Sequence, residues 1–221
     1  MFYRLSRLVC GTLFRLLWRP TVEGREHIPG SGPLIVASNH LSFIDSIIIP
    51  LAVPRKVVFL AKAEYWEGRS PLSWPRRLFV VAFDAVPVRR EQQRDAQQSL
   101  DLAREVLARG DAFGIYPEGT RSRDGRLYRG RTGVGWLALA AGAPVLPVGL
   151  VGTNEVQPIG ANVPRVRRVT VRFGEPVLPG DYAGMPPGRA RREITDEVMD
   201  RVAKLTGQDR ALAYNERAPS G

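Results

Sequence analysis

Short apolar runs alternate with longer amphipathic stretches along most of this chain, and this alternation constrains the fold more than any other feature. After Pro20, six runs have the length and the β-branched content of buried strands. They are LIVAS (34–38), KVVFLAK (56–62), DAVPV (84–88), AFGIYP (112–117), PVLPVGLVG (144–152) and RVTVRFG (168–174). Helical spacing is found over 42–53, 91–109, 132–141 and 189–206. The alternation predicts an α/β fold with a mixed, largely parallel sheet flanked by helices.

The length of 221 residues suits a single folded domain. We predict an amphipathic helix over 1–19, the domain itself over 20–207 and a C-terminal tail over 208–221, whose closing residues NERAPSG are expected to fray. Gly110 and Gly142 follow two of the helical stretches and are predicted to cap them.

Four arginines interrupt the apolar N-terminal segment, which therefore lacks the ~18 uninterrupted apolar residues of a spanning helix. On a helix, Arg4, Arg7, Arg15 and Arg19 lie within roughly 120° of one another, and apolar side chains occupy much of the remaining surface. This pattern is typical of a helix that lies in a membrane interface, although a helix packed on the domain is the alternative. No small-residue cleavage site follows, so we do not expect a removed signal peptide.

The net charge of +10 favours anionic partners such as lipid headgroups, phosphorylated small molecules or nucleic acid. No nucleic-acid-binding signature accompanies the charge, so nucleic acid is the least favoured partner. The single cysteine, Cys10, excludes an internal disulfide and a cysteine-based zinc site. These features favour a peripheral or monotopic protein on the cytoplasmic face of the cell membrane.

His40 is the strongest candidate for catalysis, since the chain has only two histidines and His27 lies in a turn-rich stretch. His40 follows the strand LIVAS, where open α/β sheets present functional side chains, and Asp45 stands five residues on. An imidazole can take a hydroxyl proton while a carboxylate on its other nitrogen fixes the tautomer. The alternative is structural, because Ser42 and Asp45 also match a helix capping box.

The motif YPEGTRS (116–122) follows another apolar strand. Glu118, Gly119, Thr120 and Arg121 form a turn whose backbone N–H groups, hydroxyl and guanidinium can hold a phosphate. A solvated turn, in which Glu118 pairs with Arg121 at the surface, is the competing interpretation.

Two further strands carry candidate residues. Arg89 and Arg90 follow the strand at 84–88, either as phosphate ligands or simply as a charged strand exit. Pro147 interrupts the run 144–152, which leads into a loop that can shape a pocket wall, although a buried core strand explains the pattern nearly as well.

Taken in order, NHLSFID, VPVRR, YPEGTRS and VLPVGLVG resemble the four motif blocks of the lysophosphatidic acid (1-acylglycerol-3-phosphate) acyltransferase family, within the glycerophospholipid acyltransferase superfamily. The resemblance covers roughly residues 21–173, and an ordered set of four blocks is far more specific than one. It implies an enzyme that moves a fatty acyl group from acyl-CoA or acyl-carrier protein to the sn-2 hydroxyl of 1-acyl-glycerol-3-phosphate, giving phosphatidic acid. No metal or cofactor is implied.

The resemblance also implies a role for each matching residue. His40 is the general base, Asp45 orients it and Asn39 supports the loop. The residues that bind the acceptor's glycerophosphate are Glu118, Gly119, Thr120 and Arg121, with Arg90 or Arg89. Pro147 lines the acyl side. Arg89 departs from the family, which often has an acidic residue there, and this departure leaves open which of the two arginines contacts the phosphate and whether the headgroup is a different one. The alternatives are an acyltransferase for another lysolipid, a thioesterase and a non-catalytic basic module.

Overall fold

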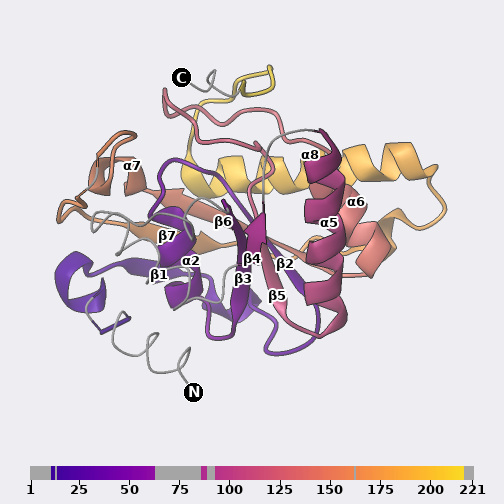
Figure 1. Cartoon of the computed structure of the whole chain (residues 1–221), viewed down its shortest axis with the longest axis horizontal. Helices are drawn as coiled ribbons and strands as arrows, with labels where there is room; N and C mark the ends of the chain where they lie inside the picture. The colour runs from indigo at the N-terminus through magenta and orange to yellow at the C-terminus, as the bar shows by residue number, and fades with distance from the viewer. Residues whose placement is uncertain (1–10, 13, 63–85, 89–92, 162, 217–221) are drawn as a thin grey trace.

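The computed structural model describes residues 11, 12, 14–62, 86–88, 93–161 and 163–216 of the chain (Figure 1). Its elements in chain order are β1 (Thr21–Glu23), η1 (Arg25–His27), β2 (Leu34–Ser38), α2 (Asp45–Ala52), β3 (Val57–Lys62), β4 (Val86–Val88), α5 (Gln93–Ala108), β5 (Ala112–Ile115), α6 (Gly133–Ala141), β6 (Val145–Val151), α7 (Thr153–Val156), β7 (Thr170–Phe173), η3 (Pro179–Tyr182) and α8 (Pro187–Thr206). Residues 14–18 form a helical segment ahead of β1. No helix within these ranges combines the length and hydrophobicity needed to span a bilayer.

The strands form one seven-stranded sheet in the order β1-β7-β6-β2-β5-β3-β4. Every neighbouring pair is parallel except β6 and β7, which run antiparallel. The predicted α/β fold with a mixed, largely parallel sheet is therefore confirmed. All six predicted strands are present, and the sequence missed only β1, whose three residues are too few to show a period.

Helices cover both faces of the sheet (Figure 1), which explains why all five residues of β2 are buried. Alternate residues of β2 enter different cores. Leu34 and Val36 pack with α2 and the helical segment 14–18, whereas Ile35 and Ala37 pack with α5, α6 and α8. Such a strand has no polar face, and it reads in the sequence as a continuous apolar run rather than an alternation.

The parallel arrangement brings separate motifs to one edge of the sheet. Strands β2, β3, β4, β5 and β6 all point the same way, so their carboxyl ends lie at the same edge. His40 follows β2 and the YPEGTRS motif follows β5. The topology alone therefore accounts for the approach of residues that are about eighty positions apart in the chain.

Glycines follow the ends of two helices, and a third glycine lies in a strand where the neighbouring ring leaves no room for a side chain. Gly142 caps α6 in the left-handed conformation (φ 57°), and its N–H donates to the carbonyl of Ala138, as predicted. Gly110 follows α5 with φ 78°. Gly114 of β5 has a different role, because a Cβ there would lie 2.1 Å from the ring of Phe59 on β3.

The chain does not leave the domain after α8. Residues 208–216 lie along the loop that follows the YPEGTRS motif, where the N–H of Leu127 donates to Asp209 and the N–H of Ala211 donates to Leu127. Asn215 is buried, and its side chain donates to the carbonyl of Arg121 at 3.3 Å. The expectation that Asn215 belongs to a frayed tail is therefore wrong, because this residue is buried and the segment before it is hydrogen-bonded to the loop after β5.

Candidate active site

His40 and Asp45 form a hydrogen-bonded pair at the carboxyl edge of the sheet. Nδ1 of His40 lies 2.9 Å from Oδ2 of Asp45, and the two side chains are 16% and 0% exposed. Because a carboxylate only accepts, Nδ1 donates in this contact, and in a neutral imidazole the lone pair is then on Nε2. No hydrogen bond reaches Nε2 from the part of the chain that the structure describes. The pair thus has the geometry of a base with its orienting carboxylate.

Asp45 also organises the turn before α2. Its Oδ2 accepts hydrogen bonds from the backbone N–H groups of Leu41 at 2.7 Å and Ser42 at 2.8 Å. The hydroxyl of Ser42 donates to the carbonyl of Gln157 at 2.6 Å and accepts from the N–H of Ile44 at 3.4 Å, not from that of Asp45. Only the carboxylate half of the predicted capping box forms. The structural and the catalytic interpretations of Asp45 are therefore compatible, because one oxygen serves the turn and the imidazole together.

Tyr116 supports the imidazole from one side. The two rings are stacked, with centroids 3.8 Å apart and planes at 7°, and the Tyr116 ring lies 5.4 Å from that of Phe59. The Tyr116 hydroxyl lies 2.9 Å from Oγ of Ser46 on α2. A flat contact on one face and a hydrogen bond at Nδ1 fix both the tilt and the rotation of the His40 ring. The sequence analysis did not assign Tyr116 a role.

Glu118 joins the YPEGTRS loop to the His40 loop. It is fully buried, and its carboxylate accepts from the N–H of His40 at 3.1 Å through Oε1 and from the N–H of Tyr128 at 2.9 Å through Oε2. Burial raises the pKa of Glu118 to about 7, against the opposing effect of the two backbone N–H groups. Since both oxygens are engaged by backbone groups, Glu118 is placed to hold the loop in shape.

The residues after Glu118 turn back towards His40. Gly119 has φ 80°, and its N–H donates to the carbonyl of Tyr116 at 3.0 Å. The N–H of Ser122 donates to the carbonyl of His40 at 2.7 Å, so Thr120 and Arg121 lie in a short connection beside the imidazole loop. Both are partly exposed, and no described residue receives a hydrogen bond from the Arg121 guanidinium.

The later arginines of this loop are engaged elsewhere. Arg126 pairs with Asp124 at 2.7 Å. The guanidinium groups of Arg129 and Arg131 lie over the ring of Tyr214, 5.3 and 5.5 Å from its centroid. Arg121 and Arg123 are therefore the arginines of this loop whose guanidinium groups form no hydrogen bond, ion pair or ring contact with a described side chain, and Arg121 is adjacent to Ser122, whose N–H donates to the His40 carbonyl.

Asn39 extends the pairing of β2 with β6 through its side chain. Oδ1 accepts from the N–H of Leu150 at 2.8 Å, and Nδ2 donates to the Leu150 carbonyl at 2.9 Å. Nδ2 also donates to Oε1 of Gln208 at 2.8 Å, and Nε2 of Gln208 donates to the carbonyl of Gly125 at 2.6 Å. A glutamine just beyond α8 thus ties the residue before His40 to the loop after β5.

The sequence offered no signal for Gln208, because it is 169 positions from its partner Asn39 and stands outside the four motif blocks.

Three predicted site residues remain. Arg89 and Arg90 lie outside the described residues. Pro147 is buried in β6, opposite Ala37 of β2, and its carbonyl accepts from the N–H of Gly174 at 2.9 Å.

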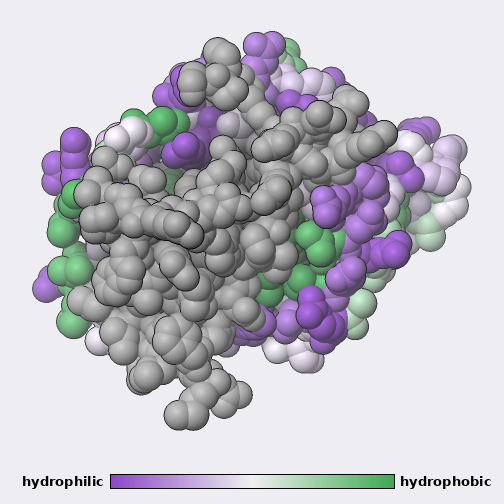
Figure 2. Space-filling model, viewed as in Figure 1, coloured by the Kyte–Doolittle hydropathy of each residue, from purple (hydrophilic) through white to green (hydrophobic). Residues whose placement is uncertain are grey.

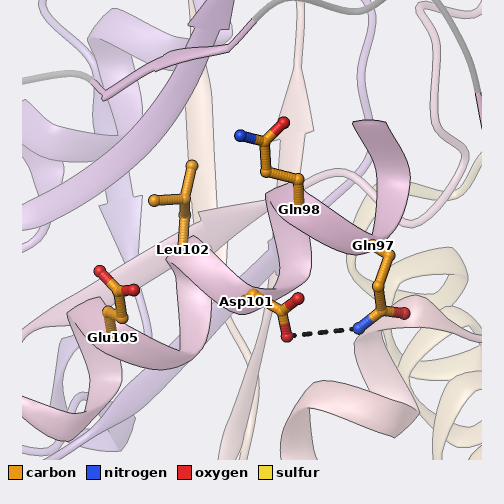
Figure 3. Close-up of a pocket in the computed structure, with 5 residues that line it drawn as sticks. All are labelled: Gln97, Gln98, Asp101, Leu102 and Glu105. Carbon is orange, nitrogen blue, oxygen red and sulfur yellow. Dashed lines mark hydrogen bonds between the residues drawn. The ribbon is translucent and has the colours of Figure 1, made fainter. Parts of the chain in front are cut away.

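A hollow elsewhere in the molecule does not match the expected chemistry. Figure 3 shows that it lies on α5, and its described lining is Gln97, Gln98, Asp101, Leu102 and Glu105. Two carboxylates and no cation line it, so it is poorly suited to a phosphate. Within the described ranges, no group of three or more His, Cys, Asp and Glu side chains is arranged to hold a metal ion.

Comparison with known proteins identifies the family and the fold. The family model described as Acyltransferase matches residues 19–151. The crystal structure of the 1-acyl-sn-glycerophosphate acyltransferase PlsC from Thermotoga maritima has a TM-score of 0.67 at 27% identity, covering 90% of this chain and 80% of that one. The match to PlsC spans both the sheet and the helices on its faces.

Two curated relatives are 1-acyl-sn-glycerol-3-phosphate acyltransferases. BAT2 of Brassica napus is 31% identical over 183 residues, which cover 82% of this chain and 51% of that protein. The Bacillus subtilis protein is 25% identical over 186 residues, covering 83% and 86%. The chain spans about half the length of the chloroplast relative and most of the bacterial one. The predicted resemblance is confirmed, and the chain belongs to the acyltransferase family, among its lysophosphatidic acid acyltransferases.

Proposed function

We propose that this chain transfers a fatty acyl group from a thioester to the sn-2 hydroxyl of 1-acyl-glycerol-3-phosphate, producing phosphatidic acid. The observation that carries the proposal is the His40–Asp45 pair, 2.9 Å apart, at the edge of the sheet where Arg121 also lies. The names of the relatives support the same reaction.

In the proposed mechanism, Nε2 of His40 accepts the proton of the acceptor hydroxyl while the hydroxyl oxygen attacks the thioester carbonyl carbon. Asp45 stabilises the imidazolium that forms. When the tetrahedral intermediate collapses, the carbon–sulfur bond breaks and the imidazolium returns its proton to the leaving thiolate. His40 thereby begins and ends the cycle neutral, and the protein itself carries no acyl group.

The acceptor's phosphate is proposed to bind at the loop of Gly119, Thr120 and Arg121, together with Arg90 or Arg89. Turn N–H groups and a guanidinium are suited to a phosphate dianion. The hydrogen bonds of Glu118 to the backbone support an indirect contribution, in which it shapes this loop.

The donor is proposed to be acyl-CoA or acyl-carrier protein, with Pro147 on the acyl side. The helix over 1–19 is proposed to contact an anionic membrane surface, at the cytoplasmic face, while residues 20–207 form the acyltransferase domain. Residues 208–221 form the tail, whose described part contacts the catalytic loops.

The test is transfer of a labelled acyl group by purified protein with lipid vesicles, over a matrix of donors and lysolipid acceptors. We expect His40→Ala to lower kcat at least about a hundredfold. His27→Ala, which changes the only other histidine, is the matched control and is expected to retain activity. Near-normal transfer by the His40 variant would overturn the base assignment. Hydrolysis at one rate with and without acceptor would instead indicate a thioesterase.

A further inference from the structure

The loop between α7 and β7, residues 157–168, exposes apolar side chains among arginines. Val163 is 75% exposed, Val166 is 60% exposed and Ile159 is 39% exposed. Arg165, Arg167 and Arg168 are also exposed. None of these three guanidinium groups forms an ion pair with a carboxylate of the described residues. Single exposed apolar residues are common on soluble proteins, but a cluster flanked by unpaired cations is typical of a membrane-binding surface.

The helical segment 14–18 continues this surface. Leu16 and Leu17 are 69% and 45% exposed, whereas Phe14 packs into the core. The indole N–H of Trp18 donates to the carbonyl of Arg165 at 2.8 Å and so joins the segment to the loop. Figure 2 shows hydrophobic residues beside hydrophilic ones along the left edge of the molecule, next to α7. We call the exposed residues of both parts the basic-apolar surface: Arg15, Leu16, Leu17, Ile159, Val163, Arg165, Val166, Arg167 and Arg168.

The basic-apolar surface is connected to the catalytic loop. The hydroxyl of Ser42, two residues after His40, donates to the carbonyl of Gln157, the first residue of the 157–168 loop. The N–H of Arg165 donates to the carbonyl of Val156 at 2.7 Å, which closes the base of the loop. The base of the loop that carries the exposed valines is therefore joined directly to the turn after His40.

We propose that the 157–168 loop is a second membrane-binding element, which together with residues 14–18 docks the protein on a bilayer that contains anionic lipid. Val163, Val166, Leu16 and Leu17 enter the boundary between headgroups and acyl chains, and the arginines contact lipid phosphates. A bilayer fits this surface because the apolar side chains protrude beside unpaired cations. The inference names the partner of the proposed acyltransferase, but lipid binding does not depend on the chemistry of His40, so the two proposals can fail separately.

The first experiment is sedimentation of the full chain with phosphatidylcholine vesicles, with and without phosphatidylglycerol. We expect Arg167→Gln/Arg168→Gln to weaken binding to the anionic vesicles by roughly twenty-five-fold, at about fivefold for each of the two cations removed. Val163→Ser/Val166→Ser is expected to weaken it by roughly tenfold or more. Arg189→Gln/Lys204→Gln removes the same charge from α8, and Leu212→Ser changes an apolar residue that is 91% exposed on the 208–216 segment. Both controls should bind as the unchanged protein does.

A second experiment reports depth of insertion. In a Cys10→Ser background, Val163→Cys carries an environment-sensitive dye, and Leu212→Cys carries it as the control. A blue shift on adding anionic vesicles is expected at position 163 and not at 212. Equal shifts, or vesicle binding that is unaffected by the loop variants, would overturn the proposal.

Two further outcomes separate this proposal from other interpretations. Loss of binding to an acidic carrier protein, with vesicle binding unchanged, would assign the surface to that partner instead. Transfer to a water-soluble short-chain acceptor should persist in every loop variant, and its loss would count against the inference rather than against the role of His40.

Discussion

The ring of Tyr116 lies flat against the imidazole of His40, with 3.8 Å between the ring centroids and 7° between the planes. Removal of this contact by Tyr116→Ala should free the imidazole to tilt, and we expect kcat to fall roughly tenfold or more with a smaller change in KM. Tyr116→Phe keeps the stacked ring and loses the hydroxyl that contacts Ser46, so it should stay within a few-fold of the unchanged enzyme. Steady-state kinetics of the two variants provide the test. Equal losses in both would assign the effect to the hydroxyl instead.

Glu118 should make stability depend on pH. Burial raises the pKa of Glu118 from 4.5 to about 7, so between these values the folded chain holds a proton that the unfolded chain has released. Ionisation of Glu118 therefore destabilises the fold as pH rises from about 5 to 8, by up to about 3 kcal/mol. Glu118→Gln cannot ionise, although it loses one backbone hydrogen bond and is less stable at low pH.

Urea unfolding of both proteins at pH 5 and at pH 8 measures this effect. The free energy of unfolding of the unchanged protein should exceed that of the Gln variant by more at pH 5 than at pH 8. An excess that grows with pH would mean that the N–H groups of His40 and Tyr128 stabilise an ionised carboxylate and outweigh burial.

Gln208 is expected to act on catalysis through Asn39. Gln208→Ala removes the hydrogen bonds to Asn39 and to Gly125, which should lower stability by about 1–2 kcal/mol and lower kcat several-fold, with KM for the donor unchanged. Gln208→Glu keeps the acceptor for Asn39 but puts an oxygen against the Gly125 carbonyl, so rescue should be partial at best. Gln98→Ala on α5 is the matched control. A loss of stability without any change in kcat would show a merely structural role.

Gly114 should tolerate no side chain. A Cβ at this position lies 2.1 Å from the Phe59 ring, and Phe59 in turn lies against Tyr116. We expect Gly114→Ala to lower the free energy of unfolding by about 1–3 kcal/mol and to lower activity as the aromatic stack shifts. Gly188→Ala, where a Cβ meets no atom within 4 Å, should be neutral. Thermal unfolding and kcat give the comparison, and Phe59→Leu added to Gly114→Ala should restore part of the stability.

Much of this architecture follows from the sequence because it depends on local patterns. The run LIVAS forms β2 with the predicted bounds, and parallel pairing then brings His40 to the same edge as the YPEGTRS motif. The proximity of Asp45 to His40 also follows, since the chain must turn between a strand end and a helix start. The sequence therefore predicted the features that a short apolar run or a tight turn determines.

The remaining features depend on long-range contacts and on burial. Glu118 stands in a motif that indicates phosphate binding, yet only the fold shows both of its oxygens bonded to backbone N–H groups. Gln208 and Asn215 have no distinguishing neighbours, and their partners are supplied by loops far away in the chain. The sequence could not distinguish the two interpretations of Asp45, because one oxygen of its carboxylate contacts both the His40 ring and the backbone of the turn.

The sharing of one Asp45 oxygen between imidazole and turn limits how this enzyme can be redesigned. A substitution of Asp45 that changes its contact with His40 also loosens the start of α2, and one that rebuilds the turn displaces the carboxylate from the His40 ring. Variants that test the proposed headgroup contacts should therefore diversify Thr120 and Arg121, whose side chains are partly exposed, and leave residues 39–45 unchanged.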